Sequence, residues 1–342
     1  MPELDPAPDI PTLLMLTFGY YGLMNVDWDS LDRANWEGFH RQHGSSLQQA
    51  WAYGQALQTL NVRIHRAAIR VPRDGPGPGG EPGGVIMGLA QFMVRRIAGY
   101  ISLASCTRGP VWHPDLAPEA RAQALTMLRK SLPVPRLRVA LFSPDAPASP
   151  EVEAETRGLW RVMTGYSTVM LDLTQPLEAL RAGLDGKWRN RLAKTEADPS
   201  FTARVEPNLP EAKRLLERET EQRTQRRFQG LPTDFVRAYI DAAPSREQGF
   251  AVSYAQSRKE TQAALLFLIH GDTATYHIGW SNEAGRKANA HNLLMWRGIE
   301  YLRHIGVKRL DLGGVNTHAL PGITRFKLGT GGQVLTLAGS YH

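Results

Sequence analysis

Residues 291–334 read HNLLMWRGIEYLRHIGVKRLDLGGVNTHALPGITRFKLGTGGQV, and they are the most informative part of the chain about its fold. Met295, Ile299 and Leu302 recur at helical spacing and predict a helix from about 288 to 305. KRLDLGG then predicts a strand, and QVLTLAG predicts a closing strand. Strands that alternate with helices are typical of an α/β unit, in which helices cover a central sheet.

Between these two strands, residues 310–332 combine glycine-rich turns with charged side chains. Asp311 is expected to end the first strand, Gly313-Gly314 permits a backbone turn with positive φ, and Pro321-Gly322 predicts another turn.

Two cations, Arg325 and Lys327, follow beside Gly329, Gly331 and Gly332. Cations fixed among glycines suit the close approach of the backbone to a ligand. A tight connection between two strands, without a ligand, is the alternative interpretation.

A second unusual segment is basic and lies at residues 187–194, KWRNRLAK. In a helix, Lys187, Arg191 and Lys194 share one face, with Arg189 set off from it. Like charges at that spacing disfavour a helix by a few tenths of a kcal/mol each, so a bound anion is a reasonable counterweight. A solvated helix face is the alternative.

The remainder of the chain predicts two similar α/β units that share an interface. Ser45-Ser46 is expected to cap a helix, and strands are expected at 62–71, after residue 84, at 100–106 and at 136–142. The stretch 72–84, PRDGPGPGGEPGG, predicts a loop, and DAPASPE at 145–151 predicts a linker. The second half predicts a strand at 168–173, a helix at 177–197, helices near 210–226 and 232–242, and strands at 249–255, 262–270 and 273–280.

Composition excludes several classes of protein. The 342 residues include 42% hydrophobic and 21% charged residues, as in globular proteins, so disorder and coiled coils are excluded. The net charge of +7 favours phosphate-rich partners, although residues 1–60 carry two basic against seven acidic residues. The single cysteine, Cys106, precludes an intrachain disulfide. No signal peptide or membrane span is recognisable, so a cytoplasmic protein is expected.

Motifs for the common catalytic classes are missing from the sequence. The sequence contains no H-E-x-x-H zinc motif and no G-x-S-x-G motif of serine hydrolases. It also contains no Walker A motif and no G-x-G-x-x-G dinucleotide-binding motif. We therefore expect no metal site and no bound cofactor, and we expect Cys106 to be a small buried thiol.

Four motifs resemble the Fem (FemXAB) peptidyltransferases, a family with a GNAT-like fold. The C-terminal stretch quoted first resembles their signature of a helix, G-x-x-x-x-D-x-G-G and G-I-x-x-F-K-x-G-x-G, which is the most specific of the four. DLTQPLEALRAGLDGKWRNRLAKTEA, residues 172–197, resembles their strand and basic helix. Arg108-Gly109-Pro110 resembles their R-G-P turn, and SSLQQAWAYG, residues 45–54, resembles their opening helix. The resemblance covers most of residues 45–342 and none of the acidic extension, residues 1–44.

The resemblance implies an α/β (α+β) fold of two tandem GNAT-like domains, residues 45–150 and 151–342, with a cleft between them. It implies that Lys327 lies where an oxyanion develops. It also implies that Arg189 and Arg191 bind phosphate and that Arg108 contributes to substrate binding. We expect Asp311 and Arg325, within the C-terminal signature, to bind substrate as well.

The implied reaction transfers an amino acid from aminoacyl-tRNA to an amine of a peptide or cell-wall precursor, without a metal or a covalent intermediate. One alternative is an N-acyltransferase that uses an acyl-CoA or acyl-carrier-protein thioester. The other is a non-catalytic protein that binds RNA or a nucleotide-sugar. Ordinary GNAT enzymes bind the CoA pyrophosphate with [QR]-x-x-G-x-[GA], whereas this chain has RKANAH at 286–291. Acetyl-CoA is therefore not the expected donor.

Overall fold

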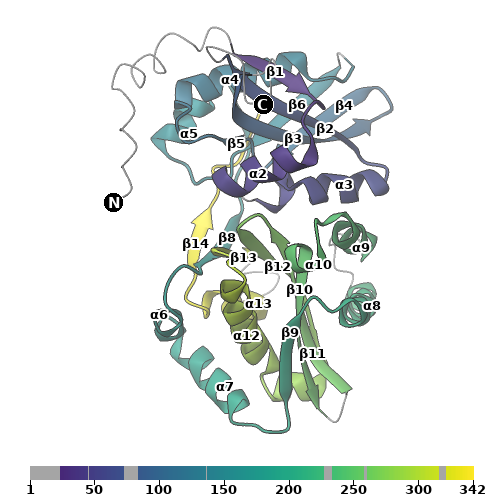
Figure 1. The fold of residues 1–342 in the computed structure, drawn as a ribbon, viewed down its shortest axis with the longest axis vertical. Coiled ribbons are helices and arrows are strands. Elements are labelled where there is room, and N and C mark those ends of the chain that lie inside the picture. Colours follow the sequence, from purple (N-terminus) through teal and green to yellow (C-terminus); the bar gives the residue numbers. More distant parts are fainter. Residues whose placement is uncertain are drawn as a thin grey trace, which may run out of the picture.

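The structure, a computed structural model, describes residues 24–44, 46–72, 84–135, 137–226, 233–257, 260–315 and 321–342. Residues 1–23 of the acidic extension and residues 73–83 of the expected loop lie outside these ranges. The described chain forms two sheets with their helices, one above the other in Figure 1. We call them the first unit and the second unit, and they confirm the prediction of two mixed α/β units.

The first unit is built on an eight-stranded sheet in the order β1-β2-β3-β4-β6-β15-β7, with β5 paired to β3. Its strands are β1 (Asn25–Trp28), β2 (Arg63–Val71), β3 (Val85–Ile97), β4 (Ile101–Thr107), β5 (Val111–Trp112), β6 (Arg138–Ser143), β7 (Arg161–Met163) and β15 (Ser340–Tyr341). Its helices are α2 (Arg33–His43), the 3₁₀ helix η2 (Leu47–Gln49), α3 (Trp51–Thr59), α4 (Pro118–Ser131) and α5 (Pro150–Glu155).

The second unit is built on a seven-stranded sheet in the order β14-β8-β13-β12-β11-β10-β9. Its strands are β8 (Ser167–Asp172), β9 (Thr202–Glu206), β10 (Phe250–Ser257), β11 (Glu260–His270), β12 (Thr273–Ser281), β13 (Arg309–Gly314) and β14 (Gln333–Thr336). Its helices are α6 (Leu177–Ala182), α7 (Gly186–Glu196), α8 (Leu209–Arg226), α9 (Thr233–Ala242), α10 (Arg246–Gly249), α11 (Glu283–Lys287), α12 (Ala290–His304) and α13 (Pro321–Leu328).

Two segments far apart in sequence run together from one sheet into the other. Strand β14 pairs with β8 in the second sheet, and β15 then inserts between β6 and β7 in the first sheet. Between these pairs, the Leu337 N–H donates to the Tyr166 carbonyl at 3.1 Å. Residues 24–44 also contribute β1 and α2 to the first unit, so the sheets do not follow the ranges 45–150 and 151–342 taken from the resemblance.

A continuous apolar core joins the two units. Helix α3 of the first unit packs against α9 of the second, where the rings of Tyr53 and Phe235 lie 5.0 Å apart. The opposite face of the second sheet is covered by α7 and α12, whose apolar residues include Trp188 and Trp296 (Figure 1). A shared core of this kind stabilises one relative position of the two units.

The basic helix that the sequence predicts at 177–197 consists of two helices. Gly183 ends α6, and the Asp185 carboxylate begins α7 by accepting the backbone N–H groups of Lys187 and Trp188 at 3.0 and 3.2 Å. The N-cap interaction satisfies amide groups that have no partner within the helix, and so it favours a new helix start at this point. Within the described ranges, no helix is both long and apolar enough to span a bilayer.

Candidate active site

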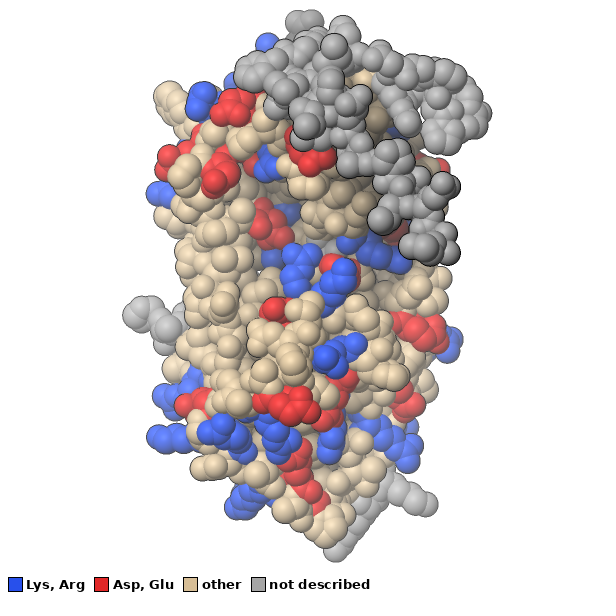
Figure 2. All heavy atoms as spheres, turned by 60° about the vertical axis from the view of Figure 1, so that its left-hand side comes forward, with Lys and Arg blue, Asp and Glu red and all other residues tan. Residues whose placement is uncertain are grey.

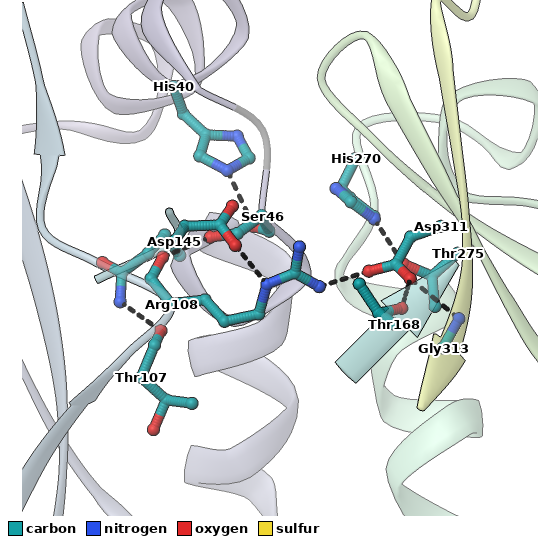
Figure 3. Close-up of polar contacts among 11 residues, drawn as sticks. His40, Ser46, Thr107, Arg108, Asp145, Thr168, His270, Thr275, Asp311 and Gly313 are labelled. Carbon is teal, nitrogen blue, oxygen red and sulfur yellow. Dashed lines mark hydrogen bonds and ion pairs between the residues drawn. The ribbon is translucent and has the colours of Figure 1, made fainter. Parts of the chain in front are cut away.

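A buried ion pair between the units lies at the centre of the site. Arg108 follows β4 with a positive φ of 50°, next to the cis peptide bond Gly109–Pro110. Its guanidinium donates through Nε to Asp145 Oδ1 at 2.5 Å and through Nη1 to Asp311 Oδ2 on β13 (Figure 3). The side chains of Arg108 and Asp311 are only 6% and 3% exposed. The pair connects the end of a strand in the first sheet to the middle of a strand in the second.

Three donors surround the Asp311 carboxylate. Besides Arg108, the Thr168 hydroxyl donates to Oδ1 at 2.5 Å and the Gly313 N–H donates to the same oxygen at 2.7 Å (Figure 3). Burial alone would raise the pKa of Asp311, but the charge of Arg108 and these hydrogen bonds outweigh it and lower the pKa. Burial dominates at Asp145, whose pKa is raised despite Arg108. Asp311 is therefore ionised at neutral pH, although the sequence predicts that it ends the strand rather than lying within it.

Ser46 has a different role from the one the sequence predicts. It makes no side-chain cap, because the residues after it form η2 and α3 begins only after Ala50. Its hydroxyl instead donates to the Arg108 carbonyl at 2.7 Å, and its own carbonyl accepts from His40 Nε2 at 2.9 Å (Figure 3). These contacts hold the backbone of Arg108 in position behind its ion pair.

Lys327 lies on α13, close to the same point of the second sheet. Its ammonium donates to the Gly314 carbonyl at 2.8 Å, and the residue is only 9% exposed. Burial lowers the pKa of Lys327, and the nearby Asp311 carboxylate opposes that shift. Gly313 has a φ of +74°, and a β-carbon placed there would lie 3.5 Å from Lys327 Nζ. A side chain at Gly313 would therefore enter the space in front of the ammonium.

The segment that carries Lys327 is a helix, so the prediction of a turn at Pro321-Gly322 was wrong. Pro321 is the first residue of α13, a position where proline has a suitable φ and where its missing N–H removes no helical hydrogen bond. Gly313 adopts the positive φ that the sequence predicts. Arg325 is an exposed residue of α13, and its role in substrate binding stays a prediction.

Helix α7 supports α13 through Trp188. The indole of Trp188 packs on the ring of Phe326 at 5.9 Å, and its Nε1–H donates to the Phe326 carbonyl at 3.1 Å. A β-carbon at Gly329 would lie only 2.6 Å from the indole, so glycine permits this close packing. The buried face of the basic helix therefore fixes the turn of helix that presents Lys327.

The basic residues of α7 point away from this buried network. Lys187, Arg189, Arg191 and Lys194 are all exposed, and Arg189 also donates to the Ala182 carbonyl at 3.2 Å. Figure 2 turns this side of the molecule forward, and basic side chains, with acidic ones among them, cover the lower part of the second unit. The structure thus brings together Arg108, Asp311 and Lys327, whereas Arg189, Arg191 and Arg325 lie on exposed helix surfaces.

Three residues of the network have roles that the sequence did not reveal. Asp145 lies in the stretch expected to be a linker, Thr168 was expected only to start a strand, and Trp188 only to belong to a basic segment. No local pattern marks the first two, because their partners are distant in sequence. The tryptophan within a polar, basic helix was a usable signal, since one large apolar side chain implies a buried face.

Strands β12 and β13 separate next to this network. They pair in parallel only from Thr273–Arg309 to Thr275–Asp311, so the residues beyond Thr275 on β12 leave β13. The backbone after β12 then turns through α11 into α12. Asn289, with a φ of 55°, lies where the pyrophosphate motif of ordinary GNAT enzymes has its first glycine.

Most backbone N–H groups of this connection donate within the chain: those of Arg286, Ala288, Asn289 and Asn292 donate to carbonyls, and that of Gly285 donates to Asn282 Oδ1. Ala290 and His291, in the first turn of α12, differ, since no described residue accepts from their N–H groups. The connection thus departs from the loop of ordinary GNAT enzymes in its sequence, by Asn289 in place of glycine, and not by a lack of free amides at the helix N-terminus. Among the described residues, no group of three or more His, Cys, Asp or Glu side chains is arranged to hold a metal ion. Cys106 is fully buried, as predicted, and burial raises its pKa.

Comparisons with known proteins agree with this architecture. Residues 185–328 match the model of the acetyltransferase (GNAT) domain. The crystal structure of FemX aligns with a TM-score of 0.77 at 13% identity, covering 92% of this chain and 96% of FemX. L-PGS from Bacillus licheniformis aligns with a TM-score of 0.52 at 12% identity, covering 91% of each chain. The C-terminal domain of a proposed lysylphosphatidylglycerol synthetase from Agrobacterium fabrum aligns with a TM-score of 0.53 at 13% identity, covering 91% of this chain and 92% of that one.

No curated protein matches the sequence. The fold is nevertheless shared over nearly the whole length of FemX, and the domain match includes α7, β12, β13 and α13. The fold implied by the resemblance is confirmed: the described chain has a FemX-like fold of two GNAT-like units, and its second unit contains the match to the acetyltransferase (GNAT) domain.

Proposed function

We propose that the protein transfers an amino acid from an aminoacyl-tRNA to an amine of a peptide or cell-wall precursor. The observation that carries the proposal is the position of Lys327. Its ammonium is buried beside the diverging strands, and one of its three N–H groups is used by the Gly314 carbonyl. Among the described residues no acceptor takes the other two, so they are available to a substrate oxygen.

The chemistry of an aminoacyl ester suits such a site. The acceptor nitrogen attacks the carbonyl carbon, the C–N bond forms, and the C–O bond to the ribose oxygen breaks. The ester is already activated, so the enzyme mainly has to align the amine and stabilise the oxyanion. Lys327 is proposed to donate to that oxyanion, which exists only on the way to the amide.

The charge of the buried network supports this role. Asp311, ionised beside Arg108, is the charged group nearest in effect to Lys327. Its carboxylate favours the charged form of Lys327 and opposes the effect of burial. The charged form is the one an oxyanion requires.

The surface of α7 supports a polyanionic donor. Arg189 and Arg191, with Lys187 and Lys194, line an exposed helix whose other face supports the helix of Lys327. A tRNA whose phosphates bind there would have its aminoacylated end close to α13, where Arg325 is also exposed. A thioester donor on CoA receives less support, because Asn289 stands where the pyrophosphate loop of ordinary GNAT enzymes has a glycine. Proteins similar in fold include FemX and a domain of a proposed lysylphosphatidylglycerol synthetase, and the name of the latter is consistent with an aminoacyl donor.

The proposal is tested by incubating the protein with a charged total tRNA pool and a lysine-containing peptide or a UDP-linked muropeptide, followed by mass spectrometry of the acceptor. Wild-type protein is expected to add an amino acid, and Lys327→Met is expected to reduce turnover by about 10²–10³-fold, as the loss of one oxyanion donor does. Circular dichroism and thermal melting establish that the variant is folded. Transfer from acetyl-CoA or an acyl-carrier protein, with none from any aminoacyl-tRNA, would overturn the proposal.

A further inference from the structure

We infer that one end of the first unit binds the surface of a membrane that contains anionic lipids. This end is formed by the hairpin between β3 and β4, the start of β6, the end of α4 and the residue before β7. Such binding does not depend on the proposed aminoacyl transfer, because it requires no turnover.

The hairpin between β3 and β4 ends in exposed apolar side chains. Ile97 pairs with Ile101, and the backbone turns between them through Ala98 and Gly99, which have φ values of 51° and 80°. Ile97 is 49% exposed and Tyr100 is 63% exposed. All six residues from 95 to 100 are exposed, so no described part of the chain covers the tip of the hairpin.

Leu137 extends this apolar surface from the neighbouring strand. Its carbonyl accepts the Ser102 N–H at 2.9 Å, which places Leu137 beside the start of β4, and the residue is 62% exposed. Single exposed apolar residues are common on proteins, whereas a group of them marks a surface that binds a partner or a membrane.

Cations lie next to these apolar side chains. Arg95 and Arg96 precede the tip of the hairpin, and Arg96 lies opposite Ser102, which in turn lies opposite Arg138. The Arg138 guanidinium donates to the Lys130 carbonyl at 2.6 Å, so it connects this row of residues to the end of α4.

A basic cavity of about 260 Å³ continues the surface on the side of α4. Its lining consists of Arg129, Lys130, Arg138, Ala140 and His342. His342, at the end marked C in Figure 1, exchanges backbone hydrogen bonds with Trp160 at 2.9 and 3.0 Å. Among the large apolar side chains that the structure describes, Trp160 is the most exposed, at 82%. An aromatic ring therefore borders the basic cavity.

Carboxylates are scarce at this end of the unit. Residues 82–114 and 120–144, which supply β3, β4, β6 and most of α4, contain neither Asp nor Glu. Asp29 follows Trp28, whose indole donates to Ser131 at the end of α4, but its carboxylate is already paired with His65 at 2.8 Å. Exposed cations that form no ion pair with any described residue are Arg95, Arg96, Arg129 and Lys130. The surface therefore carries a positive charge that is complementary to anionic headgroups.

The combination of side chains favours a bilayer over a nucleic acid. Arginine and lysine keep their charges among headgroups while their aliphatic stems lie along apolar surface, and tryptophan and tyrosine are enriched at the same level of a membrane. Isoleucine and leucine leave water when they enter the acyl region, but they offer RNA neither hydrogen bonds nor an aromatic face. Ile97 and Leu137, at the most exposed part of this end, are thus better suited to lipid.

The test measures co-sedimentation of the full-length protein with vesicles of phosphatidylcholine alone and of phosphatidylcholine mixed with phosphatidylglycerol. Wild type is expected to bind the mixed vesicles and to dissociate from them as salt is raised, because the attraction acts within a Debye length. Arg95→Ala combined with Arg96→Ala is expected to lower the partition coefficient about fivefold for each cation removed.

Ile97→Ser combined with Leu137→Ser tests the apolar part of the surface. The partition coefficient is expected to fall by about tenfold or more, since two side chains no longer leave water on binding. Val85→Ser combined with Val334→Ser is the matched control, because it removes two exposed apolar side chains elsewhere and should bind as wild type does. Circular dichroism and thermal melting establish that each variant is folded.

The outcomes distinguish a membrane from other partners. Wild type that binds neither kind of vesicle, or both equally, would overturn the inference, as would an Ile97→Ser and Leu137→Ser variant that binds as tightly as its control. Loss of tRNA affinity in the double arginine variant, with unchanged vesicle binding, would assign the surface to RNA instead. Absence of aminoacyl transfer would remove the proposed function and leave vesicle binding intact, so the two proposals can fail separately.

Discussion

Arg108 and Asp311 lie 203 residues apart in sequence and form a buried ion pair between the two units. Arg108 also pairs with Asp145, so loss of Asp311 removes one of its two charged partners. A buried hydrogen bond to a charged group typically contributes about 1.5–3 kcal/mol. The ion pair therefore matters for stability as well as for the site.

Asp311→Asn is expected to lower the free energy of unfolding by about 1.5–3 kcal/mol at pH 7, since Arg108, Thr168 and Gly313 lose a charged acceptor while Arg108 keeps Asp145. Because folding lowers the pKa of Asp311, its contribution is fully present above its ordinary pKa of 3.8 and is lost as pH falls through the lower folded value. Urea denaturation measures the change. Asp172→Asn, at an exposed carboxylate, is the control, and equal effects in the two variants would contradict the buried pair.

His40 is expected to make stability depend on pH in a mildly acidic range. Burial lowers its pKa from 6.5 to about 4, although Asp272 opposes the shift, while Arg41 and Arg309 add to it. The unfolded chain then binds the proton more readily, so stability is complete above pH 6.5 and falls by about 3 kcal/mol towards pH 4.

His40→Gln keeps a donor for the Ser46 carbonyl and should flatten this dependence. Denaturation curves between pH 4 and 7 measure it, with His304→Gln, at an exposed histidine on α12, as the control. Some slope is expected to stay in the variant, because the pKa of His277 is lowered in the same way. An unchanged slope in His40→Gln would show that folding does not lower the pKa of His40.

Trp188→Phe tests whether α7 positions Lys327. Phenylalanine keeps an aromatic ring against Phe326 but loses the hydrogen bond to its carbonyl, worth about 1 kcal/mol. A small displacement of a catalytic group is costly, so kcat should fall about tenfold or more while KM changes little. Trp296→Phe is a matched control, because the Trp296 indole is as buried and its N–H has no partner among the described residues. Equal kcat values in both variants would exclude a positioning role.

Arg189→Ala combined with Arg191→Ala tests the basic surface of α7. If both residues bind phosphates, affinity for tRNA should fall, and the slope of log affinity against log salt should decrease by about one for each arginine that no longer binds a phosphate. The melting temperature should change little, since exposed charges contribute at most about 1 kcal/mol each. Arg129→Ala combined with Lys130→Ala removes the same charge from exposed positions on α4. Identical salt slopes in the two double variants would mean that α7 is an ordinary solvated helix.

Helices and strands could be predicted where their own residues form a clear hydrophobic pattern. The strands expected at 249–255, 262–270 and 273–280 agree within two residues with β10, β11 and β12, because their apolar runs are long and bounded by polar turns. The prediction of a turn at Pro321-Gly322 was wrong for a physical reason. Proline is common in turns, but it is also common at the first position of a helix. Asp185 and Gly183 could have divided the basic helix, since an acidic N-cap after a glycine marks a new start.

The site could be predicted only in its separate parts. Lys327, Arg108 and Asp311 were expected as substrate-binding or catalytic residues, and the structure places them together, while their roles stay predictions. Their meeting point depends on pairings across 37 and 203 residues, as between Arg108 and its two carboxylates, and no local periodicity encodes such pairings.

The insertion of β15 between β6 and β7 has a consequence for synthesis on the ribosome. Among the strands that the structure describes, β7 pairs only with β15, so the first unit cannot finish its sheet until residues 340–341 have left the exit tunnel. Pairing over so long a stretch of chain slows folding, because the entropy of loop closure opposes it before the strands meet. The amino-terminal half must therefore wait, partly assembled, while the entire second unit is translated.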